Sequence, residues 1–431
     1  MDTSDTTKQL PVEPDIKPSS DSNFESNFES NFEQRFNLVT SRLQEIIGLE
    51  HLKTLIQTKP NPSIYWGTAP TGSIHLGYLV PLLKVADFLK ADCEVIIFLA
   101  DMHAILDNLK TTPALIAFRT QYYEHMIKQI LIRLQVPVDR LKFVTGSSFQ
   151  TSSAYIMDLY KLSTMVTQHD AKKAGAEVVK QTDNPKLSSL IYPLMQALDE
   201  EYLKVDIQFG GIDQRKIFTL AMECLPLIGY RKRIHLMNPM LPAIGAKPKT
   251  ETNELIGSSE ETSLATLNRI QEQLTNGTDK SIVVSNLETL LGDMTTDSQK
   301  SNISDAKMSS SNVNSKIDLL DSKPSIKKKI NSAYCLEGDM SFNPLMNLME
   351  HVICPMIAHL EGIFEINRPA KFGGSVSYGS YQEILEAFVN KKLHPQDLKL
   401  GMIDYLDNFM SPIRTFFSQP EMKALVAKAY Y

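Results

Sequence analysis

Residues 65–78, with the sequence YWGTAPTGSIHLGY, decide the fold that we expect for this chain. A strand-like run, IYW at 64–66, leads into a turn rich in Thr, Pro and Gly, and a helical pattern follows at 74–91. The next apolar run, EVIIFLAD at 94–101, has the length and composition of a buried parallel strand. Strand, helix and strand in this order predict a βαβ unit.

The same alternation continues on both sides of this unit. We expect an amphipathic helix at 36–56 and a long helix at 113–134. LKFVTG at 141–146 and VDIQFGG at 205–211 have strand-like patterns. Strands that alternate with helices predict an α/β fold with an open parallel sheet, whose ligands bind at the carboxyl ends of the strands.

Composition places the chain among globular proteins. Of its 431 residues, 42% are hydrophobic and 22% are charged, and no apolar run is long enough for a membrane helix. The four cysteines lie far apart, without the spacing of a zinc site or a disulfide framework. The acidic N-terminus lacks the apolar or arginine-rich pattern of a targeting segment, so we expect a cytoplasmic protein without a membrane partner.

Three changes of composition suggest domain boundaries. Residues 1–36 are polar, with the repeat SNFESNFESNFE, and we expect a disordered tail. A catalytic domain at 37–320 would carry a low-complexity insertion at 246–306, which is rich in Ser, Thr, Asn and Glu. The pattern at 321–431 is mostly helical, with one irregular stretch at 368–380, and predicts a separate helical domain.

The turn in the opening stretch has the features of an anion site. Gly72 and Gly77 allow close approach of a ligand, and a helix starting near Ile74 would offer free N–H groups. His75, in the first turn of that helix, is placed to donate a hydrogen bond to a phosphate. Taken alone, a histidine near a helix start is more often a surface residue.

A second polar segment favours the same chemistry. AKMSSSNVNSKIDLLD at 306–321 places Lys307 before a run of hydroxyls that includes Ser309 and Ser310. A flexible loop led by a lysine suits a mobile phosphate clamp, and a solvated linker is the alternative. The two segments together are more specific than either alone.

A third group of residues predicts a small-molecule pocket. Tyr192, Gln196 and Asp199 share one face of a helix that Pro193 is expected to start. Gln214 follows a Gly-Gly turn after a strand, and Tyr65 is expected to end the earlier strand at the same edge. These five side chains suit one zwitterionic ligand with a phenol ring.

These motifs resemble known signatures. The segments SIHLGY and KMSSS are similar to the HxGH and KMSKS motifs of class I aminoacyl-tRNA synthetases. Together with YWGTA, ADMHA, YPLMQALDEEYLKVDIQFGGIDQRKIF and HLMNPM, they make the chain resemble the tyrosyl-tRNA synthetases of eukaryotic and archaeal type over about residues 40–420. The resemblance implies a Rossmann-type catalytic domain, a helical anticodon-binding domain and a homodimer. It also implies tRNA(Tyr), L-tyrosine and ATP with Mg²⁺ as partners, and no tightly bound cofactor or dedicated metal ligand.

The resemblance also assigns roles to residues. Tyr65 and Asp199 would hold the hydroxyl of tyrosine, and Tyr192, Gln196 and Gln214 its ammonium group. The catalytic residues would be His75, Lys307, Ser309 and Ser310, and the ATP-binding residues Gly67, Thr71, His75, Gly77, Lys307 and Met308. The anticodon would be read by Phe372, His394, Pro395 and Asp397, because an aromatic platform and a carboxylate suit an unstacked base.

Two departures from the pattern bear on mechanism. Tyr78 stands where HxGH has its second histidine, and KMSSS lacks the second lysine of KMSKS. Stabilisation of the charge in the transition state would therefore rest more heavily on His75 and Lys307. Two alternatives stay open: a tryptophanyl-tRNA synthetase, and a catalytically silent RNA-binding or regulatory protein derived from this fold.

Overall fold

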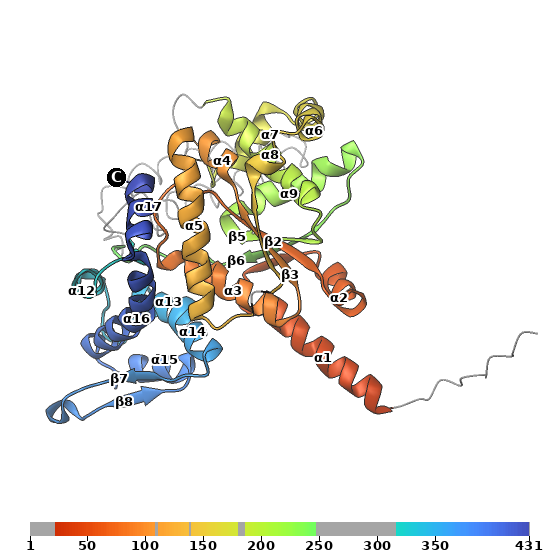
Figure 1. Ribbon diagram of the computed structural model, residues 1–431. Coiled ribbons are helices and arrows are strands. Elements are labelled where there is room, and N and C mark those ends of the chain that lie inside the picture. Colours follow the sequence, from red (N-terminus) through yellow and green to blue (C-terminus); the bar gives the residue numbers. More distant parts are fainter. Residues whose placement is uncertain (1–21, 108–110, 138, 180–185, 247–315, 431) are drawn as a thin grey trace, which may run out of the picture.

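A six-stranded sheet forms the centre of the protein, as the computed structural model shows (Figure 1). The structure describes residues 22–107, 111–137, 139–179, 186–246 and 316–430. The strands follow the order β1-β6-β5-β2-β3-β4, and all neighbours are parallel except β1 and β6. Their bounds are β1 (Glu45–Ile47), β2 (Ser63–Thr68), β3 (Glu94–Leu99), β4 (Leu141–Thr145), β5 (Ile207–Gly211) and β6 (Ile234–Asn238).

The predicted βαβ unit is confirmed. β2 pairs in parallel with β3, and α3 (Leu79–Lys90) connects them. α5 (Pro113–Arg133) then leads to β4, as the sequence predicts. Since β2 and β5 are parallel neighbours, the segments after both strands leave the same edge of the sheet.

The helix predicted at 36–56 is wrong in its middle. α1 (Ser22–Thr40) ends early, β1 follows, and α2 (Leu49–Thr58) begins only after Gly48. Gly48 has φ +90°, a left-handed conformation that interrupts a helix and favours glycine. The pairing of β1 with the edge of β6 outweighs the local helical pattern, since it satisfies backbone groups along that edge.

The tail predicted to be disordered at 1–36 is helical from residue 22, whereas residues 1–21 lie outside the described residues. The C-terminal half of α1 packs against the core. Phe32 and Phe36, one turn apart on α1, stack with ring centroids 5.6 Å apart and contact the core cluster, in which Val39 is buried. Lys84 of α3 donates to the carbonyls of Leu38 and Ser41, both at 2.6 Å, at the end where helix carbonyls lack partners. Figure 1 shows α1 extending away from the body of the molecule.

The other helices before residue 247 gather around the sheet edge. They are α4 (Asp101–Leu106), α6 (Ser153–Ser163), α7 (Gln168–Gly175), α8 (Ser188–Tyr202) and α9 (Arg215–Cys224). In Figure 1, α4, α6, α7 and α8 lie together at the top of the molecule. The insertion predicted at 246–306 falls almost entirely on residues 247–315, outside the described residues.

The region after residue 320 is mostly helical, as predicted. Its helices are α12 (Lys323–Ser332), α13 (Pro344–Leu348), α14 (Cys354–His359), α15 (Tyr381–Val389), α16 (Pro395–Phe417) and α17 (Pro420–Tyr430). The irregular stretch at 368–380 belongs to a small antiparallel pair, β7 (Phe364–Ile366) and β8 (Val376–Tyr378). Among the described helices, none has the length and apolarity that a membrane crossing requires.

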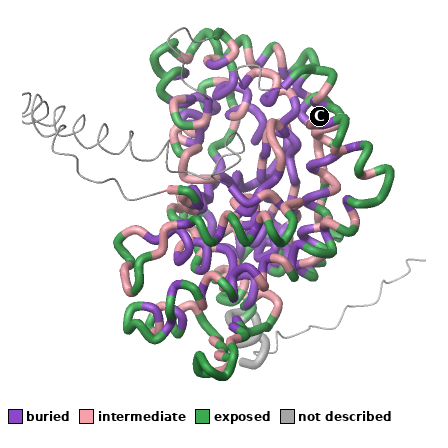
Figure 2. Tube along the Cα trace, turned by 90° about the vertical axis from the view of Figure 1, so that its left-hand side faces the viewer, coloured by how far each residue is buried: buried purple, intermediate pink, exposed green. Residues whose placement is uncertain are grey.

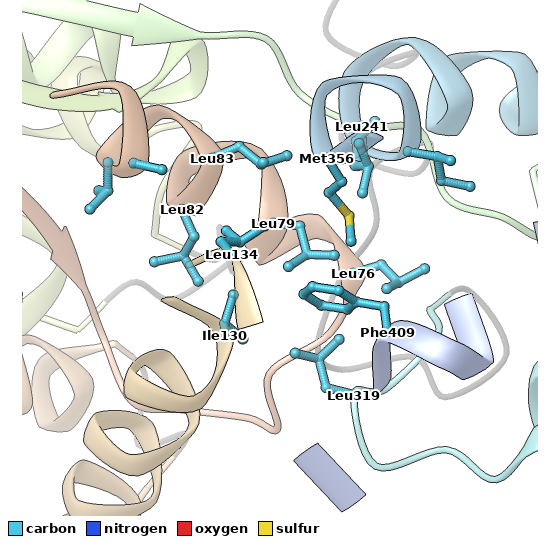
Figure 3. Packing of buried hydrophobic residues seen from close by; sticks show 14 of the residues in the cluster. Leu76, Leu79, Leu82, Leu83, Ile130, Leu134, Leu241, Leu319, Met356 and Phe409 are labelled. Atoms are coloured by element: carbon cyan, nitrogen blue, oxygen red, sulfur yellow. The ribbon is translucent and has the colours of Figure 1, made fainter. Parts of the chain in front are cut away.

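One hydrophobic core joins the two regions. Buried residues of α3, α5, α14 and α16 belong to a single packed cluster, and Figure 3 shows Leu79 between Met356 and Phe409. Figure 2 shows the buried residues gathered in the interior of the molecule and the exposed residues toward its outside. The turn that carries the first signature is therefore anchored on both sides, since Leu76 and Leu319 are fully buried in this core.

Candidate active site

A cavity of about 330 Å³ opens at the edge of the sheet where β2 and β5 end. The segments after these two strands line it together with the first turns of α3 and the inner face of α8. The five residues predicted to bind the amino acid all line this cavity: Tyr65, Tyr192, Gln196, Asp199 and Gln214. The sequence analysis thus grouped side chains that lie up to 149 positions apart in the chain.

Asp199 lies at the closed end of the cavity and is fully buried. Its Oδ1 accepts hydrogen bonds from Gln150 Nε2 at 2.7 Å and from Tyr155 OH at 2.9 Å. Among the described residues, its Oδ2 has no hydrogen-bond partner, and neither has the hydroxyl of Tyr65. Buried polar atoms without partners are rare, so both groups are suited to a ligand that supplies a hydroxyl.

The electrostatics of this end follow from burial. Loss of water raises the pKa of Asp199 to about 8, and hydrogen bonds from Gln150 and Tyr155 oppose the shift. Burial and the neighbouring Asp199 raise the pKa of Tyr65 well above its usual value. His103 Nε2 lies 3.6 Å from Asp199 Oδ2, and burial lowers the pKa of His103 to about 3. A ligand hydroxyl between these groups would satisfy atoms that the protein leaves unpaired.

Tyr65 and α8 differ from the prediction in detail. Tyr65 lies in the middle of β2 and not at its end, paired with Ile96 and Gln208 of the adjacent strands. α8 begins at Ser188, so Pro193 lies inside the helix and does not start it. The predicted common face of Tyr192, Gln196 and Asp199 does not depend on where the helix begins.

The mouth of the cavity carries the polar groups predicted for an ammonium ion. Gln196 Nε2 donates to Gln214 Oε1 at 2.8 Å, which links α8 to the segment after β5. The ring of Tyr192 meets that of His103 edge-on, with centroids 4.6 Å apart. A Cβ at Gly210 would lie 2.9 Å from Gln214 Oε1, so the Gly-Gly turn leaves room for this amide. Amide and phenol oxygens can accept the hydrogen bonds of an ammonium group.

His75 is 6% exposed and lines the other end of the cavity. Burial, and secondarily the charge of Lys316, lower its pKa to about 3, so the imidazole is neutral at physiological pH. Its Nδ1 accepts the Gly77 N–H at 3.2 Å, which leaves the proton on Nε2. His75 can therefore donate one hydrogen bond, but it brings no positive charge.

The helix predicted from Ile74 begins later. His75 precedes a 3-10 turn at Leu76–Tyr78, and α3 starts at Leu79. The N–H of Leu76 donates to Ile317 O at 2.9 Å, so this group is not free for an anion. The reason is the segment after residue 315, which pairs with the turn through a bridge between His75 and Asp318.

Tyr78, which replaces the second histidine of the signature, also lines the cavity. Its hydroxyl lies 3.1 Å from that of Tyr123, and its ring meets that of His75 edge-on at 5.1 Å. Tyr123 in turn donates to Gly72 O at 2.6 Å. Tyr78 thus supports the imidazole of His75 and links α5 to the turn.

The structure describes only some of the predicted ATP-binding residues. Gly67 and Gly77 line the cavity, and a Cβ at Gly67 would lie 3.3 Å from Phe98 Cδ1, so a side chain there would narrow the space. Thr71 does not line the cavity; its carbonyl accepts from Arg119 Nη1 at 2.6 Å. The remaining predictions lie outside the described residues: Lys307, Met308, Ser309 and Ser310.

The four predicted anticodon residues lie in the C-terminal region. Phe372 is 62% exposed, and Lys371 Nζ lies 4.9 Å from its ring centroid. Arg368 Nη1 donates to Asp397 Oδ2 at 2.9 Å. His394 Nδ1 accepts from Gln396 N at 3.1 Å and caps α16, and Pro395 begins that helix. An exposed ring and a nearby carboxylate are the groups that single-stranded base recognition requires.

The sequence reasoning missed several residues that shape the cavity. His103, Gln208 and Asn238 line it, and Gln150 and Tyr155 hold Asp199. His103 comes directly after β3 at the same sheet edge, so the placement of ADMHA after an apolar run could have identified it. Gln150 and Tyr155 had no such signal, because their role appears only when α6 and the segment before it pack on α8.

Comparison with known proteins identifies the family to which the chain belongs. The sequence matches the model of the family "tRNA synthetases class I (W and Y)" over residues 57–273 and 288–411. A Danio rerio protein named "Tyrosine--tRNA ligase, cytoplasmic" is 44% identical over 92% of this chain, which spans only 63% of that relative. A relative of the same name from Saccharomyces cerevisiae is 43% identical, and the aligned region covers 92% of this chain and 87% of the relative.

Solved structures agree with the sequence comparison. The tyrosyl-tRNA synthetase of Archaeoglobus fulgidus, complexed with L-tyrosine, has a TM-score of 0.68 at 31% identity. The match covers 89% of this chain and 99% of that structure. A tryptophanyl-tRNA synthetase from Giardia lamblia has a TM-score of 0.57 at 17% identity, which shows a common fold only. The chain belongs to the tyrosyl-tRNA synthetase family, within the class I synthetases for tryptophan and tyrosine.

Proposed function

We propose that the protein is a tyrosine--tRNA ligase. It activates L-tyrosine with ATP to enzyme-bound tyrosyl-adenylate and pyrophosphate, and then transfers the tyrosyl group to the 3′-terminal adenosine of tRNA(Tyr). The observation that carries this proposal is the unpaired set at the closed end of the cavity: Tyr65 OH, His103 Nε2 and Asp199 Oδ2. A phenol placed there gives these atoms the hydrogen bonds that they lack.

The ligand's other end fits the mouth of the cavity. In the proposed complex, Tyr192, Gln196 and Gln214 hold the ammonium group, which turns the carboxylate toward His75. The carboxylate oxygen attacks the α-phosphorus of ATP, and the bond to pyrophosphate breaks. No protein nucleophile is needed, so the chain contributes positioning and stabilisation of charge. Gly67 and Gly77 leave room for the nucleotide beside His75, and Thr71, Lys307, Met308, Ser309 and Ser310 complete the proposed ATP site.

Mg²⁺ enters this proposal as the partner of ATP. Within the described residues, no group of three or more His, Cys, Asp or Glu side chains is arranged to hold a metal ion. We therefore assign the ion to the phosphates, where it neutralises charge and orients the leaving group.

The C-terminal region, residues 321–431, is the proposed anticodon-binding domain. Phe372 would stack on the first anticodon base, with Asp397, His394 and Pro395 at the edge of that base. Arg368 pairs with Asp397 and keeps this carboxylate beside the β7–β8 pair. Because one core joins this region to α3, a tRNA that binds here is held in a fixed relation to the cavity.

A homodimer is part of the proposal. Five large apolar side chains on α6, α8 and the segments next to them are more than a third exposed: Met157, Tyr160, Met165, Leu187 and Ile191. A partly apolar face of this kind is typical of a protein interface, and the second copy would cover it. The names of the relatives suggest that the protein works in the cytoplasm.

Amino-acid-dependent ATP–pyrophosphate exchange tests the proposal. Measured with each of the twenty amino acids, exchange should depend on tyrosine alone, because only its hydroxyl satisfies both Tyr65 and Asp199. Exchange with tryptophan in place of tyrosine would identify a tryptophanyl enzyme. No exchange with any amino acid, together with retained tRNA binding, would identify the catalytically silent alternative.

A further inference from the structure

A buried lysine lies directly beside the turn that carries His75. Lys316 is the first described residue after the gap at 247–315, and its side chain is 5% exposed. Its Nζ donates to Ser73 Oγ at 2.8 Å, and the carboxylate of Asp318 is 3.9 Å away. A lysine this deeply buried normally has a close anionic partner.

The backbone fixes the position of this lysine. The segment after it pairs with the turn, where Leu76 N donates to Ile317 O at 2.9 Å and Leu319 N donates to Ile74 O at 3.2 Å. Ile317 and Leu319 are fully buried. Lys316 is therefore held against the turn that carries His75 by two hydrogen bonds and by the core.

The positive charge of Lys316 is only partly compensated. An ammonium group has three donors, and in the described part of the chain one of them is used at short range, by a neutral hydroxyl. Asp318 Oδ2 lies 3.9 Å from the ammonium, beyond hydrogen-bond distance, and Oδ1 of the same carboxylate accepts from Leu320 N at 3.0 Å. Burial lowers the pKa of Lys316 and raises that of Asp318, so both charged forms have lost stabilising water. A bound polyanion would supply the charged hydrogen-bond acceptors that the ammonium group of Lys316 lacks.

The cavity needs such a charge. Asp199 and Asp213 line it, and no lysine or arginine does so among the described residues. Lys316 lies just behind the lining, bonded to Ser73, two residues before the cavity-lining His75. His75 is neutral, and KMSSS provides one lysine where KMSKS provides two. A triphosphate with several negative charges requires cations close by.

We propose that Lys316 is a second phosphate-binding cation of the activation step, in place of the lysine that the KMSSS segment lacks. This inference rests on the proposed function. When the bond between the α-phosphorus and its bridging oxygen breaks, the electron pair stays on the departing pyrophosphate. The ammonium group of Lys316 donates a hydrogen bond to a non-bridging oxygen of that group and keeps its proton throughout.

Pyrophosphate exchange with varied ATP and saturating tyrosine tests this role. Lys316→Met keeps most of the side-chain volume and removes the charge, so kcat/KM for ATP should fall by about tenfold to a hundredfold. The KM for tyrosine, measured separately at saturating ATP, should stay within about twofold, because the residues proposed to bind the amino acid are on β2, on α8 and after β5. Lys316→Arg should recover much of the loss. Lys323→Met, the same change at a surface lysine paired with Asp404, is the matched control and should match the wild type.

Ser73→Ala separates a charge effect from a purely structural one. If Lys316 only anchors the segment through Ser73, Ser73→Ala will reduce kcat/KM for ATP as much as Lys316→Met does, and the proposal fails. Unchanged ATP kinetics in Lys316→Met would also overturn it. Circular dichroism and the thermal midpoint verify folding, and Lys316→Gln replaces the methionine variant if that one is unstable. Absence of exchange in the wild type would instead reject the proposed function.

Discussion

At the scale of single residues, unpaired atoms are the strongest indication of what the protein binds. Asp199 holds one oxygen in hydrogen bonds to Gln150 and Tyr155 and leaves the other without a partner. Tyr65 OH is likewise unpaired. The protein therefore fixes the orientation of the carboxylate and keeps one acceptor for a ligand, an arrangement that distinguishes a hydroxylated ring from a plain one.

Tyr65→Phe tests this distinction. The variant removes one hydroxyl and keeps the ring, so the cavity should keep its shape. We expect kcat/KM for tyrosine in pyrophosphate exchange to fall about tenfold, which corresponds to one lost hydrogen bond of about 1–1.5 kcal/mol. The kcat/KM for phenylalanine should change little or rise. The ratio of kcat/KM for tyrosine to that for phenylalanine should therefore fall. An unchanged ratio between the two amino acids would show that Tyr65 does not contact the ligand's hydroxyl.

At the scale of elements, sequence patterns predicted those parts whose signal is local. β2, β3, β4, β5, α3 and α5 all follow from apolar periodicity and turn residues. The predicted helix at 36–56 was wrong because β1 exists only through its pairing with β6, which the local sequence does not encode. β6 itself was recognised as a family motif and not as a strand. The support of Asp199 by Gln150 and Tyr155 was missed for the same reason, since residues 150–155 meet α8 only in the tertiary structure.

Asp206, between α8 and β5, illustrates a long-range contact of this kind with a measurable pH dependence. Its Oδ2 accepts from Lys59 Nζ at 2.6 Å and from Ser63 N and Oγ, both at 2.9 Å, which connects the starts of β2 and β5. These hydrogen bonds outweigh the effect of burial and lower its pKa to about 2. The unfolded chain has the higher pKa of about 3.9, so the stabilisation is present above that value and is lost as the pH falls toward 2.

Asp206→Asn should therefore lower the free energy of unfolding by about 1–2 kcal/mol at pH 7. The difference from the wild type should shrink as the pH is reduced from 5 toward 2, because the wild-type carboxylate becomes protonated. Urea unfolding at several pH values measures both effects. Asp92→Asn, at an exposed pair with Arg140, is the control and should change stability by less than about 0.5 kcal/mol. A difference that does not depend on pH would contradict the assigned pKa.

At the scale of the whole molecule, one hydrophobic core connects the sheet, the turn that carries His75 and the C-terminal helices. Leu79 of α3 packs near Met356 of α14 and Phe409 of α16 (Figure 3). The C-terminal helix α17 also reaches the turn, where Tyr430 OH donates to Gly72 O at 2.9 Å. The helical region predicted to be a separate domain is thus continuous in packing with the catalytic region.

The insertion predicted at 246–306 differs in composition from the segments that form this core, because it is rich in Ser, Thr, Asn and Glu. It interrupts the chain between the segment after β6 and the buried Lys316, and a long surface insertion costs little in loop-closure entropy. We expect deletion of residues 250–303 to leave tyrosine-dependent exchange within about twofold of the wild type, since all the cavity-lining residues that the structure describes are kept. Loss of exchange in a folded deletion variant would assign the insertion a role in activation.

The central claim is that Asp199 receives the hydroxyl of tyrosine in this cavity, and tyrosine-dependent ATP–pyrophosphate exchange by Asp199→Ala tests it most directly. The variant removes the fully buried carboxylate and leaves Gln150 and Tyr155 without their acceptor. Asp206→Asn, at a carboxylate that does not line the cavity, controls for a general loss of stability. We predict that Asp199→Ala abolishes exchange while Asp206→Asn retains it. Near-normal exchange by Asp199→Ala would contradict the account.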